Sequence, residues 1–450
     1  MSARHAVVVP APEPRYGFPA PLFRALGRLR PPGAGRTRAW RSPLRGPWLT
    51  SAFGAVLLAT MPIVILTGLL DHIAYGPQFG QARPADTGWL RLPQFDWPTR
   101  PSWIFRLTQG LHVGLGLVLI PVVLAKLWSV VPRLFAWPPV RSTAQVLERL
   151  SLLALVGGLL FEIVTGVLNI QYDYAFGFDF YTAHYWGAWV FIAGFGTHTV
   201  LKVPVMLAGL RSRSLRAELR TPLADTRPEP SDPDDPDSLV ALDPAPPTTS
   251  RRGALALVGG GALFVFVLTA GQTLGGFLRP AAFLLPRGRD YGDGPNDFQV
   301  NRTPAAAGIT DTMAGPGWRL SLRGGDRPVT LSAAQLAALN QHTAELPIAC
   351  VEGWSTVQTW TGVRLRDLAL LAGVPAPAAA RVVSIERGGA FGRAWLNAGQ
   401  VLDPDSLLAL RVNGAALSLA HGAPARVIAP GVPGVHCTKW VGSIEFRRPW

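Results

Sequence analysis

The chain has 450 residues, of which 48% are hydrophobic and 16% are charged, and its formal net charge is +14. So large an apolar fraction predicts that part of the chain is embedded in lipid, with room for two or three domains. The basic balance does not indicate nucleic-acid binding, because the arginines gather in loops between apolar runs, as they do in membrane proteins.

Five apolar runs are long enough to cross a bilayer. They cover residues 48–70, 107–131, 150–170 and 184–210, and a fifth begins after Arg252. A secretory signal peptide is excluded, because the first run comes too late and is too long. Arginines predominate before the first run, between the second and third runs, and directly after the fourth. By the positive-inside rule, the N-terminus is cytoplasmic and the region after the fifth run is extracytoplasmic.

The chain therefore divides into five predicted parts. These are a basic cytoplasmic tail (1–46), a four-helix transmembrane domain (47–212), a disordered Pro- and Asp-rich cytoplasmic linker (213–250), an arginine pair with a fifth helix (251–276), and an extracytoplasmic globular domain (277–450). Arg251-Arg252 ahead of an apolar run resembles a twin-arginine export signal, which would imply that the last domain folds in the cytoplasm around a cofactor and is then exported. The alternative is a basic anchor beside an ordinary membrane helix.

Histidines in the second and fourth runs predict a haem site. His184 and His198 are 14 residues apart, which places them within about 40° of one helix face and roughly 21 Å apart along the axis, as haems in opposite leaflets require. The second and fourth runs cross in the same direction, so His112 lies near the depth of His184, while Lys126 occupies the position for an inner ligand. We expect haem b between His112 and His184, with a His112–His198 pair as the alternative and a second haem as a further alternative.

The first four runs resemble the four-helix b-type cytochromes related to bacterial cytochrome b561 and hydrogenase cytochrome b. The resemblance implies electron passage between quinone and an attached redox domain. In that family a histidine near the cytoplasmic start of the first run completes the inner haem, whereas residues 40–45 of this chain contain none. Of the other polar residues, we expect His72 at the interface, and Glu162 and Arg106 are candidates to serve a propionate or a quinol proton.

The C-terminal region has the pattern of an α+β domain rich in strands. Ser332 and Gln335 form a capping box that starts a short helix. Another helix covers 365–371 and stops at Gly373, and Asn413-Gly414 predicts a hairpin turn. Strand patterns occur at 318–323, 346–349, 380–386, 406–412, 425–428 and 440–446.

The only two cysteines, Cys350 and Cys437, both lie in this region. A disulfide is one interpretation. Cys350, however, ends an apolar strand and opens a turn, where a thiolate can bind a soft metal or act as a nucleophile. No zinc motif accompanies it. A single thiolate suits molybdenum in molybdopterin, whose dithiolene supplies most of the coordination and whose phosphate needs cationic partners.

Residues 348–371 and 421–431, followed by Lys439-Trp440, resemble the molybdopterin-binding domain of the sulfite oxidase superfamily, which includes periplasmic methionine-sulfoxide reductase. The resemblance implies that Cys350 is the thiolate ligand to molybdenum. It also implies that the pterin and its phosphate are held by Asn301, Arg302, Arg364, His421, Arg426 and Lys439.

The expected fold is thus a membrane four-helix haem bundle with a fifth anchoring helix, followed by an α+β molybdopterin domain. The expected function is transfer of an oxygen atom on the outer face, coupled through haem b to the quinone pool. Val351 to Trp354 stand where sulfite oxidases have Ala-Gly-Asn-Arg, and Phe391 stands where they place a tyrosine, so S-oxide reduction is favoured. The alternatives are sulfite-type oxidation and a cofactor-free binding module on a degenerate bundle.

Overall fold

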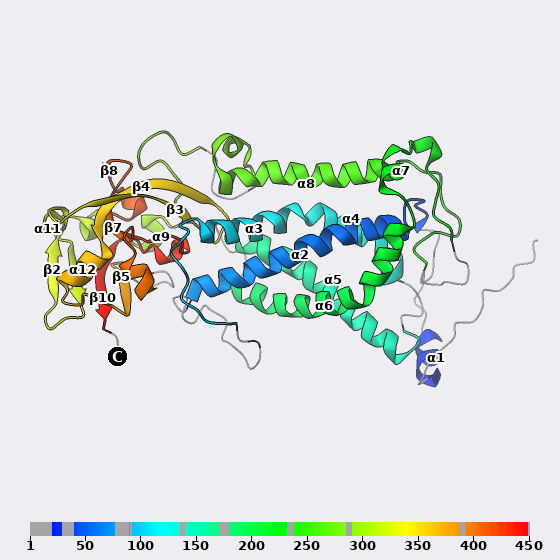
Figure 1. The fold of residues 1–450 in the computed structure, drawn as a ribbon, viewed down its shortest axis with the longest axis horizontal. Helices are drawn as coiled ribbons and strands as arrows, with labels where there is room; N and C mark the ends of the chain where they lie inside the picture. The colour runs from blue at the N-terminus through cyan, green and yellow to red at the C-terminus, as the bar shows by residue number, and fades with distance from the viewer. Residues whose placement is uncertain are drawn as a thin grey trace, which may run out of the picture. The chain divides into compact units, whose positions relative to one another are not determined.

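The computed structural model describes residues 20–28, 40–76, 90, 92–135, 140–170, 180–231, 238–284, 290–387 and 392–448 (Figure 1). Phe391 lies outside them. The chain forms two compact units. One comprises Met1–Leu58, Pro121–Leu160 and Trp189–Gly259, and the other comprises Ala59–Ile120, Phe161–Ala188 and Gly260–Trp450. The division passes through the long helices, and the candidate site residues other than His198 belong to the second unit.

All five apolar runs are helical. Among the described residues, four helices are long and apolar enough to cross a membrane: α2 (Pro47–Tyr75), α5 (Thr143–Asn169), α6 (Phe180–Arg211) and α8 (Arg251–Leu274). The second run is a broken span made of α3 (Ile104–Val118) and α4 (Ile120–Leu134). Shorter helices are α1 (Ala20–Arg28), α7 (Leu215–Arg220) and the 3-10 segment η3 (Leu223–Asp225).

The expectation of one continuous helix over 107–131 is wrong at Leu119. The Leu119 N–H still donates to Leu115 O at 2.9 Å, which completes α3. Pro121 then follows, and proline has no N–H to continue the ladder and clashes with the carbonyl four residues earlier, here that of Leu117. The helix therefore ends and α4 begins anew.

The predicted disorder of 213–250 is also wrong for the described parts of that segment. It contains α7, where Glu218 is only 6% exposed. The Glu218 carboxylate pairs with Arg251, which is 1% exposed, at 3.4 Å. Composition indicated a solvated linker, but Glu218 and Asp243 pair with arginines of the same unit. Residues 232–237 lie outside the described residues.

The C-terminal domain contains two five-stranded sheets. The first has the order β2 (Val329–Ser332), β1 (Arg319–Arg323), β10 (Val441–Arg447), β5 (Ala379–Ser384), β6 (Arg393–Asn397). The second has the order β3 (His342–Ala349), β4 (Ser355–Arg364), β7 (Leu407–Val412), β8 (Ala415–Ala416), with β9 (Arg426–Ile428) paired to β7. Only the β1–β10 pair is parallel among these strands. Helical elements of the domain and its approach are η4 (Gly276–Ala281), α9 (Pro304–Ala307), α10 (Asp311–Ala314), α11 (Ala333–Ala337), α12 (Leu365–Leu371), α13 (Ala398–Leu402), η5 (Leu419–His421) and η6 (Gly434–His436).

Several local predictions are confirmed. Ser332 and Gln335 form the capping box of α11, and α12 covers the predicted residues. Asn413 (φ 49°) and Gly414 (φ 82°) make the turn between β7 and β8. The sequence patterns do not predict β2, β4 or β6, because polar residues interrupt their apolar alternation.

Two hydrophobic cores organise the domain. The first lies between the sheets, where Leu320 and Val382 of one sheet share a cluster with Val363 and Leu408 of the other. The second joins the face of β3, β4 and β7 to the ends of α2 and α3. Its members include Cys350, Trp360 and Cys437 of the domain, and Tyr75 and Phe105 of the helices. Burying such apolar area stabilises by roughly 25 cal/mol per Å², so the domain and these helix ends pack as one body.

Candidate functional site

Cys350 lies in a closed turn between β3 and β4. Its N–H donates to Trp354 O at 2.9 Å, and the Gly353 N–H donates to Cys350 O at 3.0 Å. Gly353 has φ +87°, in the left-handed region that glycine adopts without steric cost. Cys350 is 4% exposed. The turn therefore holds the sulfur in a fixed, water-poor position.

The disulfide interpretation is wrong, because Cys350 and Cys437 are not joined. Burial raises the pKa of the Cys437 thiol, while the Arg426 guanidinium opposes that rise. Arg426 is 3% exposed and lies over the Trp360 ring, 5.7 Å from its centroid. Burial lowers the Arg426 pKa to about 10, against the influence of both sulfurs. A buried cation near Cys350 favours the thiolate, the form that binds a metal.

His421, Lys439 and Arg302 lie close together. Lys439 Nζ donates to Arg302 O at 3.0 Å and to Ala420 O at 2.8 Å. His421 Nε2 lies 2.8 Å from Asn296 O, and its ring stacks on Phe298 with centroids 3.6 Å apart. Burial, aided by the nearby Arg426 and Lys439 charges, lowers the His421 pKa to about 3. The segment before α9 and the loop around η5 therefore form one polar cluster.

Buried polar atoms without partners gather in this cluster. Among the described residues, no hydrogen bond reaches Arg426 Nε, Arg302 Nε, Thr438 Oγ1 or either amide atom of Gln299. An unsatisfied buried group costs about 1–3 kcal/mol, so several together mark the place of a polar ligand. The arginine nitrogens and the Gln299 amide nitrogen are donors that a phosphate or a pterin oxygen can accept from. The Gln299 amide oxygen can accept from a pterin N–H. Gln299 and Thr438 were missed from sequence, although both neighbour predicted residues.

Two predicted residues stand apart from these contacts. Asn301 is half-buried beside Arg302, whose Nη2 pairs with Glu386 Oε1 at 2.5 Å. Arg364 is the last residue of β4, and Ser355 is the first. The nine residue steps from Ser355 to Arg364 span about 30 Å in an extended strand. Arg364 bonds there to Pro404 O and His342. The strand thus carries Arg364 away from Cys350, and we assign it no part in holding the cofactor.

The Cys350 turn is bonded to two of the apolar helices, α3 and α8. Gln109 of α3 donates from Nε2 to Val351 O at 2.7 Å. The Thr273 hydroxyl near the end of α8 donates to Gly353 O, and Ser355 Oγ donates to Thr273 O at 2.7 Å. No sequence pattern marks Gln109 or Thr273. Their contacts with the turn after Cys350 depend on how the chain folds and not on neighbouring residues in the sequence.

The loop before α3 adds further contacts with the domain. Trp97 Nε1 donates to Gly431 O at 2.7 Å. Arg100 pairs with Asp403 at 3.0 Å and with Asp405 at 2.5 Å. These contacts and the shared core hold α3 and the C-terminal domain in one arrangement.

His112 of α3 and His184 of α6 lie close together. Their ring centroids are 6.0 Å apart with an interplanar angle of 84°. His112 Nδ1 lies 2.9 Å from Val64 O, and His184 Nδ1 lies 3.0 Å from Thr165 Oγ1 and 3.1 Å from Glu162 Oε2. Metal-binding histidines commonly form a hydrogen bond through one ring nitrogen, here Nδ1, which leaves Nε2 for the metal. Two imidazoles on one iron, with bonds of about 2 Å, have centroids roughly 6 Å apart.

Two glycines make room for these rings. A Cβ on Gly68 would lie 2.5 Å from His112 Cε1, and one on Gly166 would lie 3.2 Å from His184 Cε1. His184 and His198 are about 21 Å apart on α6. The contact of His112 with His184 therefore excludes the alternative pair with His198.

The inner haem site lacks a second imidazole. His198 is the only histidine in the described part of its unit. In the same unit, Lys126 Nζ donates to Thr50 O at 2.7 Å. His72 is buried among other side chains, where its Nδ1 lies 2.7 Å from the Tyr181 hydroxyl and its ring stacks on Tyr185. Among the described residues, His112 and His184 are thus the predicted haem ligands whose rings lie close together.

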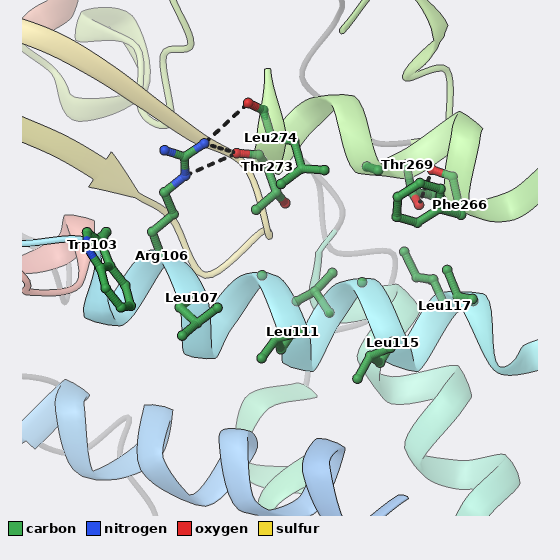
Figure 2. Close-up of a pocket in the computed structure, with 15 residues that line it drawn as sticks. Trp103, Arg106, Leu107, Leu111, Leu115, Leu117, Phe266, Thr269, Thr273 and Leu274 are labelled. Atoms are coloured by element: carbon green, nitrogen blue, oxygen red, sulfur yellow. Dashed lines mark hydrogen bonds between the residues drawn. The ribbon is translucent and has the colours of Figure 1, made fainter. Parts of the chain in front are cut away.

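An apolar groove of about 370 Å³ runs between α3 and α8 (Figure 2). Leu107, Leu111 and Phe266 are among the residues that line it. Arg106 closes one end and donates to Thr273 O at 2.9 Å and Leu274 O at 3.3 Å. Arg106 is thus engaged with α8. A groove lined in this way suits a hydrocarbon chain.

The comparisons with known proteins concern the C-terminal domain. Residues 307–449 match the family model described as "Oxidoreductase molybdopterin binding domain". The C-terminal domain is a molybdopterin-binding oxidoreductase domain. This agrees with the buried Cys350 thiol and its cationic neighbours, the features from which the cofactor was predicted.

Curated relatives are about one third identical to this chain over the aligned residues. The uncharacterized oxidoreductase YuiH of Bacillus subtilis (strain 168) is 33% identical over 136 residues, which is 29% of this chain and 66% of YuiH. Sulfite oxidase of Arabidopsis thaliana is 33% identical over 136 residues, 26% of this chain and 34% of the relative. NADH nitrate reductase of Volvox carteri is 31% identical over 154 residues, 27% of this chain and 18% of the relative. The chain spans less than two thirds of each relative's length.

Proposed function

We propose that this chain is a membrane-bound oxidoreductase in which molybdopterin at Cys350 exchanges electrons with a haem b held by His112 and His184. An oxygen atom would move to or from a small substrate at the molybdenum. Electrons would pass through the haem to or from the quinone pool. The molybdopterin-binding domain supports the first part, and the paired imidazoles of α3 and α6 support the second.

One hydrogen bond links the two proposed redox centres, the molybdenum site at Cys350 and the haem site at His112. Gln109 bonds to Val351 O, one residue from Cys350, and lies three residues before His112 on α3. Residues three apart share a helix face, with an axial rise of about 4.5 Å. Few covalent and hydrogen bonds therefore separate the thiolate from the imidazole, and no separate electron carrier is needed.

The chain's own residues would set up the molybdenum centre. Bound molybdopterin supplies a metal that cycles through two electrons and exchanges an oxygen atom. Cys350 would ligate the metal, and the buried Arg426 would supply a positive charge near that sulfur. Arg302, Gln299 and Lys439 would hold the pterin and its phosphate through donors that the protein leaves unpaired or can redirect. The cores on either side of the turn exclude water.

The residues around His112 and His184 fix their ring orientation. Val64 O accepts from His112 Nδ1, so Nε2 is deprotonated and available to iron. Thr165 and Glu162 engage His184 in the same way. The groove between α3 and α8 offers an apolar place for a quinone tail beside the helix that carries His112.

We favour reduction of S-oxides such as methionine sulfoxide as the reaction. The turn after Cys350 carries Glu352 rather than a basic residue, and the Glu352 carboxylate accepts from Trp354 Nε1 at 2.8 Å. An acidic side chain beside the metal disfavours an anionic substrate. The second candidate is oxidation of sulfite or turnover of another oxyanion, which the buried Arg426 cation favours.

We also propose that the N-terminus is cytoplasmic and that the C-terminal domain is exported after folding, with Arg251-Arg252 as the signal. Arg251 is buried against Glu218 in the folded chain. The export machinery would therefore read the pair before that contact forms. Replacing both arginines by lysine should leave the C-terminal domain protected from external protease in spheroplasts; its normal export in this variant would remove the proposal.

Metal and haem analysis of the purified chain tests the main proposal. We expect about one molybdenum and one haem b per chain. Cys350→Ser should lose molybdenum and keep haem, whereas the matched variant Cys437→Ser should keep both. Molybdenum retained in Cys350→Ser would reject the ligand assignment, and a cofactor-replete preparation without molybdenum would favour a cofactor-free binding module.

A further inference from the structure

Asp71 of α2 is a buried acid that the proposed function leaves unused. It is 3% exposed, and neither carboxylate oxygen accepts a hydrogen bond of normal geometry from the described residues. The Thr108 hydroxyl of α3 faces it, but that hydroxyl donates to Phe105 O at 3.2 Å. An unpaired charge inside a membrane helix is costly, and acids kept there have a function.

The position of Asp71 relates it to the proposed haem. Gly68, three residues earlier on the same face of α2, touches the His112 ring. Thr108 precedes His112 by four residues on α3. At 1.5 Å per residue, Asp71 and Thr108 form a layer roughly 5 Å beyond the His112 layer, on the side of the C-terminal domain. Asp71 thus lies about one helical turn from the His112 layer, on the side of Tyr75, and the Cys350 turn approaches the same part of α3 at Gln109 and Val113.

No described protein cation serves as the counterion of Asp71. Arg106, the nearby cation of α3, is engaged with Thr273 O and Leu274 O. Glu162 is paired with His184. The other titratable groups that surround Asp71 and Tyr75 are His72 of α2, Tyr181 and Tyr185 of α6, Cys350 and Glu352 of the turn, and His436 of η6.

We propose that Asp71 is the redox-linked proton acceptor of the haem at His112 and His184, a role that rests on the proposed function. A haem b held by two neutral imidazoles would lose one positive charge when it is reduced by one electron. The Asp71 carboxylate would take up one proton from water at the same time, so that the net charge of this buried region would not change. The missing hydrogen-bond partner of Asp71 is thereby explained.

The haem midpoint potential measured against pH tests this role. In the wild-type protein the potential should fall as pH rises, by up to ~59 mV for each tenfold change in proton concentration. Asp71→Asn should make the potential independent of pH. Asp367→Asn, at an exposed acid of α12, is the matched control and should keep the slope. A wild-type slope in Asp71→Asn would overturn the role.

Infrared spectroscopy of the wild-type protein gives a second readout if Asp71→Asn does not fold. Reduction should produce a protonated-carboxyl band that shifts in heavy water, and its absence would overturn the role. A chain without any b-type absorbance would overturn the haem itself. A b-type chain whose wild-type potential does not change with pH would overturn only the role of Asp71.

Discussion

Gln109 of α3 and Val351 of the Cys350 turn are joined by a hydrogen bond of 2.7 Å. His112 lies three residues after Gln109, on the next turn of the same helix. Gln109 therefore links the turn that contains Cys350 to the helix that carries His112. The contact is reinforced by Thr273 and by the close approach of Gly353 to Val113. The proposed coupling would depend on these contacts, and several of its consequences can be measured.

Replacing Gln109 by Leu removes the donor and leaves Val351 O buried without a partner. We expect electron transfer between the domain and the haem to slow by roughly fivefold, the factor that corresponds to about 1 kcal/mol. Haem and molybdenum contents should stay unchanged. Stopped-flow haem reoxidation measures the rate, with Gln358→Leu on β4 as control. An unchanged rate in Gln109→Leu would show that this bond does not matter.

The b-type absorbance should depend on His112 and His184 and not on His198. His112→Ala and His184→Ala each remove one axial ligand, so the dithionite-reduced spectrum should lose its b-type band or change to that of a five-coordinate iron. His198→Ala should retain the full band, because the described part of its unit holds no second imidazole. A full band in His112→Ala would reject the pair.

Gly353→Ala should destabilise the docked turn. Gly353 has φ +87°, and a Cβ there would lie 2.8 Å from Val113 Cγ1. Gly414 has a similar φ of 82° but open space around its Cβ position, so Gly414→Ala reports the backbone strain alone. We expect the excess cost in Gly353→Ala to be about 1–3 kcal/mol, measured by thermal unfolding of the purified chain.

The double variant Gly353→Ala/Val113→Ala provides the check on that comparison. Trimming Val113 removes the atom against which the new methyl group would press, so stability should partly recover. Equal costs in Gly353→Ala and Gly414→Ala, with no recovery in the double variant, would contradict the close approach of the turn to α3.

Acidification should destabilise the C-terminal domain through two histidines. Burial lowers the His436 pKa to about 3, and the His421 pKa is lowered to a similar value. Unfolded histidine titrates near 6.5, so between these values the unfolded state binds more protons. Stability is therefore full above about pH 6.5 and falls as pH drops towards 3, by up to about 1.4 kcal/mol per pH unit and histidine.

Thermal unfolding of the full chain at neutral and mildly acidic pH measures this slope. His436→Asn removes one of the two titrations and keeps a donor for Tyr75 O, so the slope should fall by about half. The carboxylates with lowered pKa values, such as Asp405, lose their contribution only at more acidic pH. A slope that His436→Asn leaves unchanged would contradict this account.

Local rules predicted much of the C-terminal domain because short motifs determine it. The capping box at Ser332, the stop at Gly373 and the Asn413-Gly414 turn each depend on residues within a few positions. The thiolate at Cys350 was also visible, since a strand end followed by a turn is a local pattern. The family match to residues 307–449 agrees with that interpretation.

What the sequence could not provide depends on tertiary contacts. Gln299 and Thr438 matter because their burial leaves polar atoms unpaired, and burial is not a local property. Arg364 looked like a phosphate partner until the length of β4 separated it from Cys350. Pro121 could have predicted the helix break at Leu119, but the continuous apolar run suggested a single span. The sequence did not single out Asp71, because its proposed role depends on its position in the fold, close to Gly68 and Thr108.

Reoxidation of the reduced haem by substrate tests the central claim most directly. The chain is reduced with dithionite, excess reductant is removed, and methionine sulfoxide is added while the b-type band is followed. The account predicts that the band disappears in the wild-type protein and persists in Cys350→Ser. A haem that is reoxidised equally well in Cys350→Ser, or that no sulfoxide or oxyanion reoxidises and sulfite does not reduce, would contradict it.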